Sequence, residues 1–176
     1  MFLVVLIGAA GAVTGAGRAQ SASAADTVKA TFVQRFASFV SWPDGAFATS
    51  DAPMQICVLG SAPFSAVVRS TAREQSVGGR PIVVRDLEDP AAARSCHVLY
   101  ATGASADEAL RAVQGFPVLT VTDGASRSSG RGIIHFVVVD NRVRFHIDDA
   151  QAAHNKLTIS SRLLSLALSV RGREDE

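Results

Sequence analysis

The sequence lacks the motifs by which the commonest enzyme classes are recognised. Its 176 residues contain no glycine-rich dinucleotide fingerprint, no P-loop and no G-x-S-x-G nucleophile elbow. None of the histidines has the H-x-x-x-H spacing of a common metal motif; they are His97, His135, His146 and His154. We therefore predict a protein that is not an enzyme and that carries no cofactor or metal.

Net charge is also nearly absent. Seventeen lysines and arginines stand against sixteen aspartates and glutamates, which gives a formal charge of +1. A protein that binds nucleic acid or an anionic membrane surface usually shows a clear basic excess. We therefore expect no nucleic-acid partner.

Long apolar runs are missing beyond the first two dozen residues. Met1–Val13 is almost wholly apolar, but it is shorter than the about 20 residues that cross a bilayer and matches the core of a secretory signal peptide. Ala22-Ser23-Ala24 supplies a small-x-small cleavage pattern, and Ala19 is an earlier alternative. We predict a signal peptide over residues 1–24 and export of the rest. An uncleaved membrane anchor is the alternative, because no lysine or arginine precedes the apolar run.

Cysteine is scarce, with Cys57 and Cys96 as the only two. In the cytosol such a pair would be two buried thiols, whereas in an oxidising compartment an even number favours a disulfide. The predicted export favours the disulfide. Closing a loop of about 40 residues would stabilise the fold by about 3–4 kcal/mol on the chain-entropy model.

The residues after the leader are enough for one domain, which we place at residues 25–171, with a frayed tail over 172–176. Apolar residues at helical spacing predict a first helix that ends at Pro43. Asp26 or Thr27 is the expected cap. The apolar stripe of this helix includes Val28, Phe32, Phe36 and Val40.

Strands and helices then alternate, which predicts an α/β fold with a largely parallel sheet and helices on both faces. The predicted strands cover residues 54–59, 81–84, 96–100 and 117–121. The predicted helices between them cover residues 64–73 and 104–113. The end of the chain differs: we expect a terminal β-hairpin of strands 133–139 and 143–147, turning at Asp140-Asn141-Arg142, and then helices over 149–155 and 160–170.

The second hairpin strand carries candidate ligand-binding residues. Strand alternation places Arg144 and His146 on its polar face, which we expect at the open edge of the sheet. That face is either plain solvent surface or a site for a small anion, because arginine matches carboxylates well. His135 is expected to meet His146 across the hairpin, which leaves a histidine-based metal enzyme as a third hypothesis. The glycine- and serine-rich loop Asp123–Gly132 is a solvated connection or a lid.

Phe39, Trp42 and Pro43 form an aromatic cluster at the end of the first helix. In one interpretation Trp42 anchors this segment in the core. In the other the three residues form an exposed patch that binds a partner protein.

Segments along the whole predicted domain resemble the YfiR-like family. The matching segments are Lys29–Pro43, Ile56–Gly60, Pro63-Phe64, Val77–Pro81, Cys96–Tyr100, Pro117–Val121, Gly132–Phe136, Asn141–Phe145 and Leu157–Leu164. Cys57 and Cys96 match cysteines of the family. Two positions depart from the family pattern: His135 stands where we expect asparagine, and His146 stands where many members have an acidic residue.

This resemblance implies a periplasmic regulator. The best-known member represses a membrane-bound diguanylate cyclase through the periplasmic sensor region of that enzyme, and an outer-membrane lipoprotein sequesters it. By resemblance, this chain would bind such a cyclase through Phe39, Trp42 and Pro43 and lower cyclic di-GMP. The alternative is a periplasmic small-ligand sensor for another membrane receptor, such as a histidine kinase, with Arg144, His146 and His135 as ligand residues. We also expect a homodimer, because symmetric pairs are the commonest oligomers.

Overall fold

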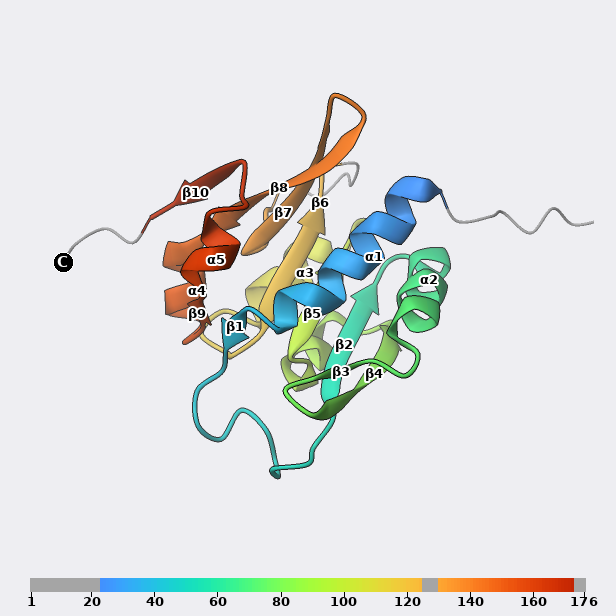
Figure 1. Cartoon of the computed structure of the whole chain (residues 1–176). Coiled ribbons are helices and arrows are strands. Elements are labelled where there is room, and N and C mark those ends of the chain that lie inside the picture. The colour runs from blue at the N-terminus through green and yellow to red at the C-terminus, as the bar shows by residue number, and fades with distance from the viewer. Residues whose placement is uncertain (1–22, 125–129, 173–176) are drawn as a thin grey trace, which may run out of the picture.

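A central eight-stranded sheet organises the chain (Figure 1). In the computed structural model, residues 23–124 and 130–172 are described; most of the predicted signal peptide, part of the loop Asp123–Gly132 and the end of the tail lie outside them. The strands, in order across the sheet, are β10 (Ser169–Arg171), β8 (Arg142–Asp148), β7 (Ile134–Val139), β6 (Leu119–Asp123), β5 (Val98–Ala101), β2 (Met54–Leu59), β4 (Arg80–Leu87) and β3 (Ser76–Val77).

Most of this sheet is parallel. The neighbouring strands β7, β6, β5, β2 and β4 all run in one direction, and β8 and β3 run against their neighbours β7 and β4. A separate two-stranded antiparallel sheet joins β1 (Val40–Ser41) to β9 (Thr158–Ile159). The predicted α/β class with a largely parallel sheet is therefore confirmed.

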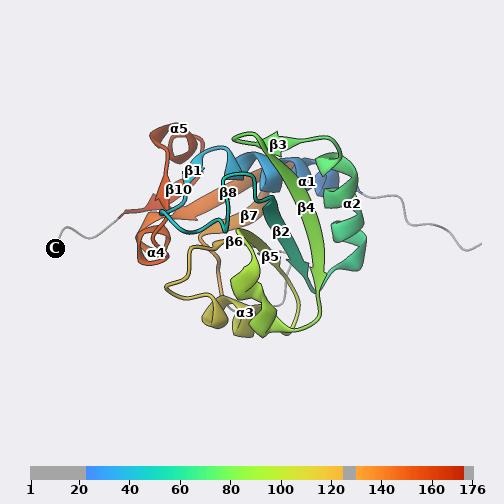
Figure 2. The ribbon, with the colours of Figure 1, turned by 90° about the horizontal axis from the view of Figure 1, so that it is seen from below.

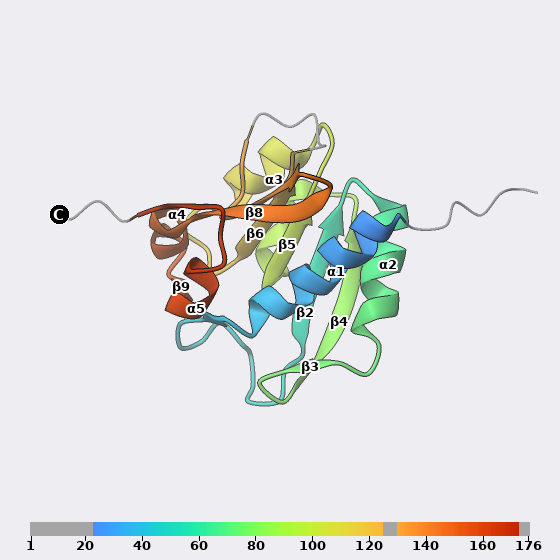
Figure 3. The same cartoon turned by 45° about the horizontal axis from the view of Figure 1, so that its top comes forward.

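Helices cover both faces of the large sheet, as Figure 2 shows from below. Helices α1 (Ala24–Ala37) and α2 (Ala62–Ala72) lie on one face. Helix α3 (Ala106–Ala112) and the 3₁₀ helix η1 (Pro90–Ser95) lie on the other. Two short helices, α4 (Asp149–His154) and α5 (Ser161–Leu164), sit beside the β8 and β10 end of the sheet (Figure 3).

Each face has its own core, because successive residues of a strand point to opposite sides. In β2, Ile56 and Val58 pack under α1 and α2, whereas Cys57 and Leu59 pack toward α3 and η1. The first core is rich in aromatic rings, with centroids 5.1–6.2 Å apart; they belong to Phe32, Phe36, Phe136 and Phe145.

The second core contains the predicted disulfide. Cys57 in β2 is bonded to Cys96, which ends η1, and their Cα atoms are 5.9 Å apart. Both cysteines are buried. The bridge therefore ties the η1 connection to a central strand from inside the core.

A buried ion pair fixes α1 to the sheet. Lys29 Nζ lies 2.5 Å from Asp123 Oδ2, and the two side chains are only 7% and 9% exposed. The Tyr100 hydroxyl donates a hydrogen bond to the same carboxylate oxygen at 3.2 Å. Burial, followed by the negative charge of Asp123, raises the pKa of Tyr100, so this hydroxyl remains a donor at all ordinary pH values. A charge pair buried this deeply is costly to break, because one ion would be left unpaired.

The predicted hairpin is confirmed, but its turn is one residue shorter than expected, because Arg142 already belongs to β8. Strands β7 and β8 pair in antiparallel register from Ile134 with Ile147 to Val139 with Arg142. The two residues between the strands, Asp140 and Asn141, have φ angles of 49° and 58°. Positive φ at both positions is the type I′ turn that matches the twist of a hairpin.

The predicted helix over residues 160–170 is wrong beyond its first turn. Helix α5 stops at Leu164, and the chain then adds the short parallel strand β10 beside β8. The backbone N–H of Leu168 donates to the Phe145 carbonyl at 2.8 Å, so the free edge of β8 captures this segment. For the same reason, β8 is not the open edge of the sheet along His146–Asp148.

The first helix also differs from the prediction at both ends. Its cap is Ser23, whose Oγ accepts from the Asp26 N–H at 3.1 Å, and not Asp26 or Thr27. Val28 is 44% exposed, and Val40 has already passed into β1. Within the described residues, no helix is long and apolar enough to cross a membrane.

Candidate functional site

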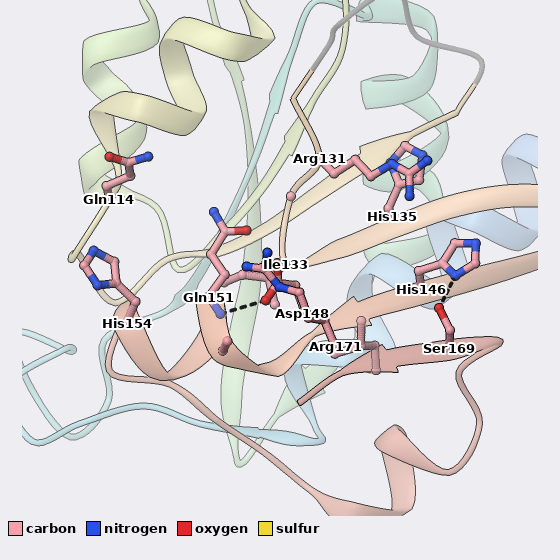
Figure 4. A pocket seen from close by; sticks show the side chains of 13 residues that line it. Gln114, Arg131, Ile133, His135, His146, Asp148, Gln151, His154, Ser169 and Arg171 are labelled. Carbon is pink, nitrogen blue, oxygen red and sulfur yellow. Dashed lines mark hydrogen bonds and ion pairs between the residues drawn. The ribbon is translucent and has the colours of Figure 1, made fainter. Parts of the chain in front are cut away.

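A cavity with a volume of about 690 Å³ lies at the β8 and β10 end of the sheet (Figure 4). Strands β7, β8 and β10, helix α4 and the segment that enters β7 contribute its side chains. The lining residues are Gln114, Arg131, Gly132, Ile133, His135, His146, Ile147, Asp148, Ala150, Gln151, His154, Ser169 and Arg171.

Two histidines face this cavity from neighbouring strands. His135 in β7 and His146 in β8 are direct cross-strand partners, as the sequence predicted. His135 Nδ1 lies 2.9 Å from Thr122 Oγ1, which also accepts a hydrogen bond from the Gly132 N–H at 2.9 Å. His146 Nδ1 lies 2.6 Å from Ser169 Oγ in β10. A hydroxyl therefore holds each ring by the same nitrogen.

The cavity has more basic than acidic groups. Arg131, Arg171 and the three histidines line it, against the single carboxylate of Asp148. Asp148 is already engaged: its Oδ2 lies 2.7 Å from Arg171 Nη2, and its Oδ1 accepts from the Gln151 N–H at the start of α4. Burial lowers the pKa of His135, and electrostatic interactions with Arg131 and then with His146 lower it further, whereas the interaction with Asp123 raises it.

The predicted ligand residues divide between two places. His135 and His146 line the cavity, whereas Arg144 lies opposite Val137 on the exposed part of β8 and is not among the lining residues. Sequence reasoning missed Ser169 and Arg171, because Ser169 lies in the stretch predicted as a helix and Arg171 directly follows that stretch. Their approach to His146 and Asp148 depends on β10, for which the helical spacing of the leucines gave no sign.

The aromatic cluster at the end of α1 is neither fully buried nor a fully open patch. Phe39, Trp42 and Pro43 are each half-buried. Trp42 Nε1 donates to the Pro117 carbonyl at 3.0 Å, so the indole is fixed against the chain that leads into β6. The Phe39 carbonyl accepts from the Ser160 N–H at 2.9 Å, which holds this segment next to β9.

A second histidine site lies behind Trp42. The His97 ring stacks on Phe47, with centroids 4.1 Å apart, and the Arg80 guanidinium lies 4.0 Å from the centroid of the same phenyl ring. His97 Nδ1 accepts from the Gln55 N–H at 3.0 Å, and Nε2 lies 3.1 Å from the Ala46 carbonyl oxygen. Because Nδ1 accepts, the ring is neutral and donates through Nε2.

The surroundings of His97 disfavour its protonation. Burial lowers the pKa of His97 and the Arg80 charge lowers it further, whereas the hydrogen bond to the Ala46 carbonyl raises it. Arg80 also donates to the carbonyls of Thr49 and Ala52 at 3.0 and 2.8 Å. The sequence did not indicate this cluster, because Phe47, Arg80 and His97 are far apart along the chain.

Side chains over residues 23–124 and 130–172 are not grouped as a metal site would require. No set of three or more histidines, cysteines, aspartates or glutamates lies close enough there to hold an ion. The hypothesis of a histidine-based metal enzyme therefore has only the His135–His146 pair behind it.

Comparison with known proteins identifies the family. A family model described as YfiR/HmsC-like matches residues 26–168, which is most of the chain. The chain belongs to the YfiR/HmsC-like family. No curated protein matches the sequence. Membership in the YfiR/HmsC-like family implies a periplasmic protein that regulates diguanylate cyclase signalling.

Proposed function

We propose that this protein is exported and represses a membrane-bound diguanylate cyclase through the periplasmic region of that enzyme, which lowers cyclic di-GMP. Membership in the YfiR/HmsC-like family is the observation that carries this proposal. The disulfide between Cys57 and Cys96 is consistent with an oxidising compartment. The repressor acts by binding, so its activity depends on a contact surface and not on a reaction.

The contact surface that we assign is the segment Phe39–Pro43 with the shallow groove beside it. Trp42, Pro43 and Asp44 line that groove together with Phe47 and Arg80. The hydrogen bond from Trp42 to Pro117 and the stacked rings behind it hold the surface in one arrangement before binding. Preorganised aromatic side chains bind partners well, because little conformational entropy remains to be lost.

Two further partners belong to the proposal. An outer-membrane lipoprotein sequesters the repressor and so relieves the cyclase, and a second copy of the chain forms a homodimer. The dimer is checked by the mass of the purified protein in solution. Export is checked by fusing residues 1–30 to a reporter that is active only in the periplasm.

A surface variant tests repression without disturbing the core. Asp44 is exposed at the rim of the groove, and Asp44→Lys places a longer, oppositely charged side chain next to Trp42. The matched control is Glu108→Lys on α3, which makes the same change of charge on the other face of the sheet. Each variant replaces the wild type in cells that contain the membrane cyclase, and cyclic di-GMP is measured.

Deleting the gene should raise cyclic di-GMP, and wild type or Glu108→Lys should lower it again. Asp44→Lys should leave the level high although the protein accumulates normally. An unchanged level after deletion, with the cyclase expressed, would show that the chain is not its repressor. Full repression by Asp44→Lys would place the contact surface elsewhere.

A further inference from the structure

We propose that the cavity between β7, β8, β10 and α4 is a binding site for a small anion that carries carboxylate or phosphate oxygens. The site lies at a different part of the fold from the Trp42 groove, and the two share no lining residue. The inference therefore does not depend on the repressor role.

The first argument is the balance of charge. Arg131 and Arg171 face the cavity against Asp148, and the ion pair with Arg171 engages that carboxylate. Arg131 has no carboxylate partner among the described residues. A guanidinium at the wall of a cavity that is open to solvent is a ready partner for an anionic oxygen, and charge-assisted hydrogen bonds of this kind are the strong ones.

The second argument is the orientation of the histidines. The Thr122 hydroxyl accepts from the Gly132 N–H, and when its own proton is donated to His135 Nδ1, the neutral imidazole carries its proton on Nε2. Ser169 Oγ lies within hydrogen-bond distance of the same nitrogen of His146, Nδ1. Nε2 of neither ring has a hydrogen-bond partner among the described residues, so both atoms can serve a ligand, while a hydroxyl fixes the direction in which each ring points.

The third argument is that the wall carrying Arg131 is rigid. The next two residues are hydrogen-bonded to side chains of β6. The Gly132 N–H donates to Thr122 Oγ1, and the Ile133 N–H donates to Thr120 Oγ1 at 2.8 Å. A Cβ on Gly132 would approach the Thr120 carbonyl oxygen to 2.8 Å, so only glycine allows the chain to run this close to β6. The backbone next to Arg131 is therefore placed by the sheet.

The charges also decide between an anion and a metal cation. Two histidines with free Nε2 atoms are potential metal ligands, but Arg131 lies near enough to His135 to lower its pKa. The same positive charge repels a divalent cation and attracts an anion. An anion would stabilise the charged form of His135, so binding should strengthen as the pH falls toward the histidine range.

Binding is tested on the purified full chain with two probes, citrate and inorganic phosphate, which represent carboxylate and phosphate chemistry. Affinity is measured by calorimetry at about pH 7.5 and about pH 6, on either side of the ordinary histidine pKa. The test variant is Arg131→Gln. The matched control is Arg144→Gln, which removes the same charge from an exposed position of β8 outside the cavity.

We expect at least one probe to bind, more tightly at the lower pH, and Arg131→Gln to weaken it by about tenfold or more, the loss expected for one charge-assisted contact. Arg144→Gln should change the affinity less than about twofold. The probe that binds more tightly identifies carboxylate or phosphate as the preferred group. If both variants weaken anion binding equally, the effect reflects the overall charge of the protein and not this cavity, and the proposal is overturned. Binding of neither citrate nor phosphate to the wild type would also overturn the proposal.

Discussion

The site of His97 and the cavity that holds His135 and His146 are built in opposite ways. At His97 both ring nitrogens are bonded to backbone groups, of Gln55 and Ala46, and one face of the ring is covered by Phe47. At the cavity, His135 and His146 are each held by one nitrogen, and a hollow of about 690 Å³ lies in front of them. The first site is closed and the second is open.

This difference indicates that the closed site contributes to the stability of the fold and the open site to ligand binding. A ring with both nitrogens bonded inside the protein has no valence left for a ligand, so His97 holds the loop behind Trp42 in place. A ring that is oriented by one nitrogen stabilises the fold less and keeps a donor for something outside. Substitutions at the closed site should therefore change the free energy of unfolding, and those at the open site should change binding.

The largest effect is expected next to the closed site, at the disulfide of Cys96, the neighbour of His97. Replacing both Cys57 and Cys96 by alanine should lower the free energy of unfolding by about 3–4 kcal/mol, because the unfolded chain regains the freedom of a loop with a sequence separation of 39. Urea denaturation of the double variant and the wild type measures the difference. A loss below about 1 kcal/mol would show that the disulfide contributes little to the stability of the region around the closed site.

The second effect is expected at His97 itself. His97→Ala leaves the Gln55 N–H and the Ala46 carbonyl without their partners and removes the stack on Phe47, so we expect a loss of about 2–3 kcal/mol. The matched control is His154→Ala, an exposed histidine of α4, which should cost less than about 0.5 kcal/mol. Thermal and urea denaturation report both. Equal effects at the two positions would contradict the description of His97 as a closed site.

The sequence predicted the sheet far better than it predicted the open site. The apolar run Met54–Leu59 and the turn residues after Val139 are local signals that determine local structure, and the strand and the hairpin that they predict are confirmed. The disulfide, predicted from the number of cysteines and the expected export, is also confirmed. The sequence also indicated that His135 and His146 would meet across the hairpin. Their direct pairing depends on a turn of two residues, whereas the predicted turn of three would place His135 opposite Ile147.

The prediction for the end of the chain was wrong for a physical reason. Leu163, Leu164 and Leu168 have helical spacing, but the free edge of β8 offers backbone hydrogen bonds that a helix cannot use, and Leu168 takes one of them. Tertiary pairing thus overrides local propensity. Since β10 brings Ser169 and Arg171 to the cavity, this part of the open site depended on a segment whose structure periodicity predicted wrongly.

The pH dependence of stability should sharpen the comparison. The pKa values of His97 and His135 are both lowered in the folded state, so each histidine stabilises the fold above its unfolded pKa of about 6.5, and this stability is lost as the pH falls through the folded-state pKa. The free energy of unfolding should therefore decline between about pH 7 and pH 5. His97→Gln, whose amide can accept from Gln55 and donate to Ala46 but does not titrate in this range, should flatten the decline. An equally steep curve for this variant would assign the decline to other groups.

The smallest effect on stability is expected in the open site, at His146. Its side chain is half-buried, and the one hydrogen bond found for it among the described residues goes to Ser169, near the end of the chain. His146→Gln should lower the free energy of unfolding by less than about 0.5 kcal/mol, because solvent can replace that bond. The same variant should weaken binding of whichever anion the wild type prefers, and calorimetry alongside urea denaturation separates the two effects. The opposite outcome is a loss of stability as large as that of His97→Ala, with anion binding unchanged. It would mean that the role of His146 is to hold β10 against β8. The contrast between a closed and an open histidine site would then depend on His135 alone.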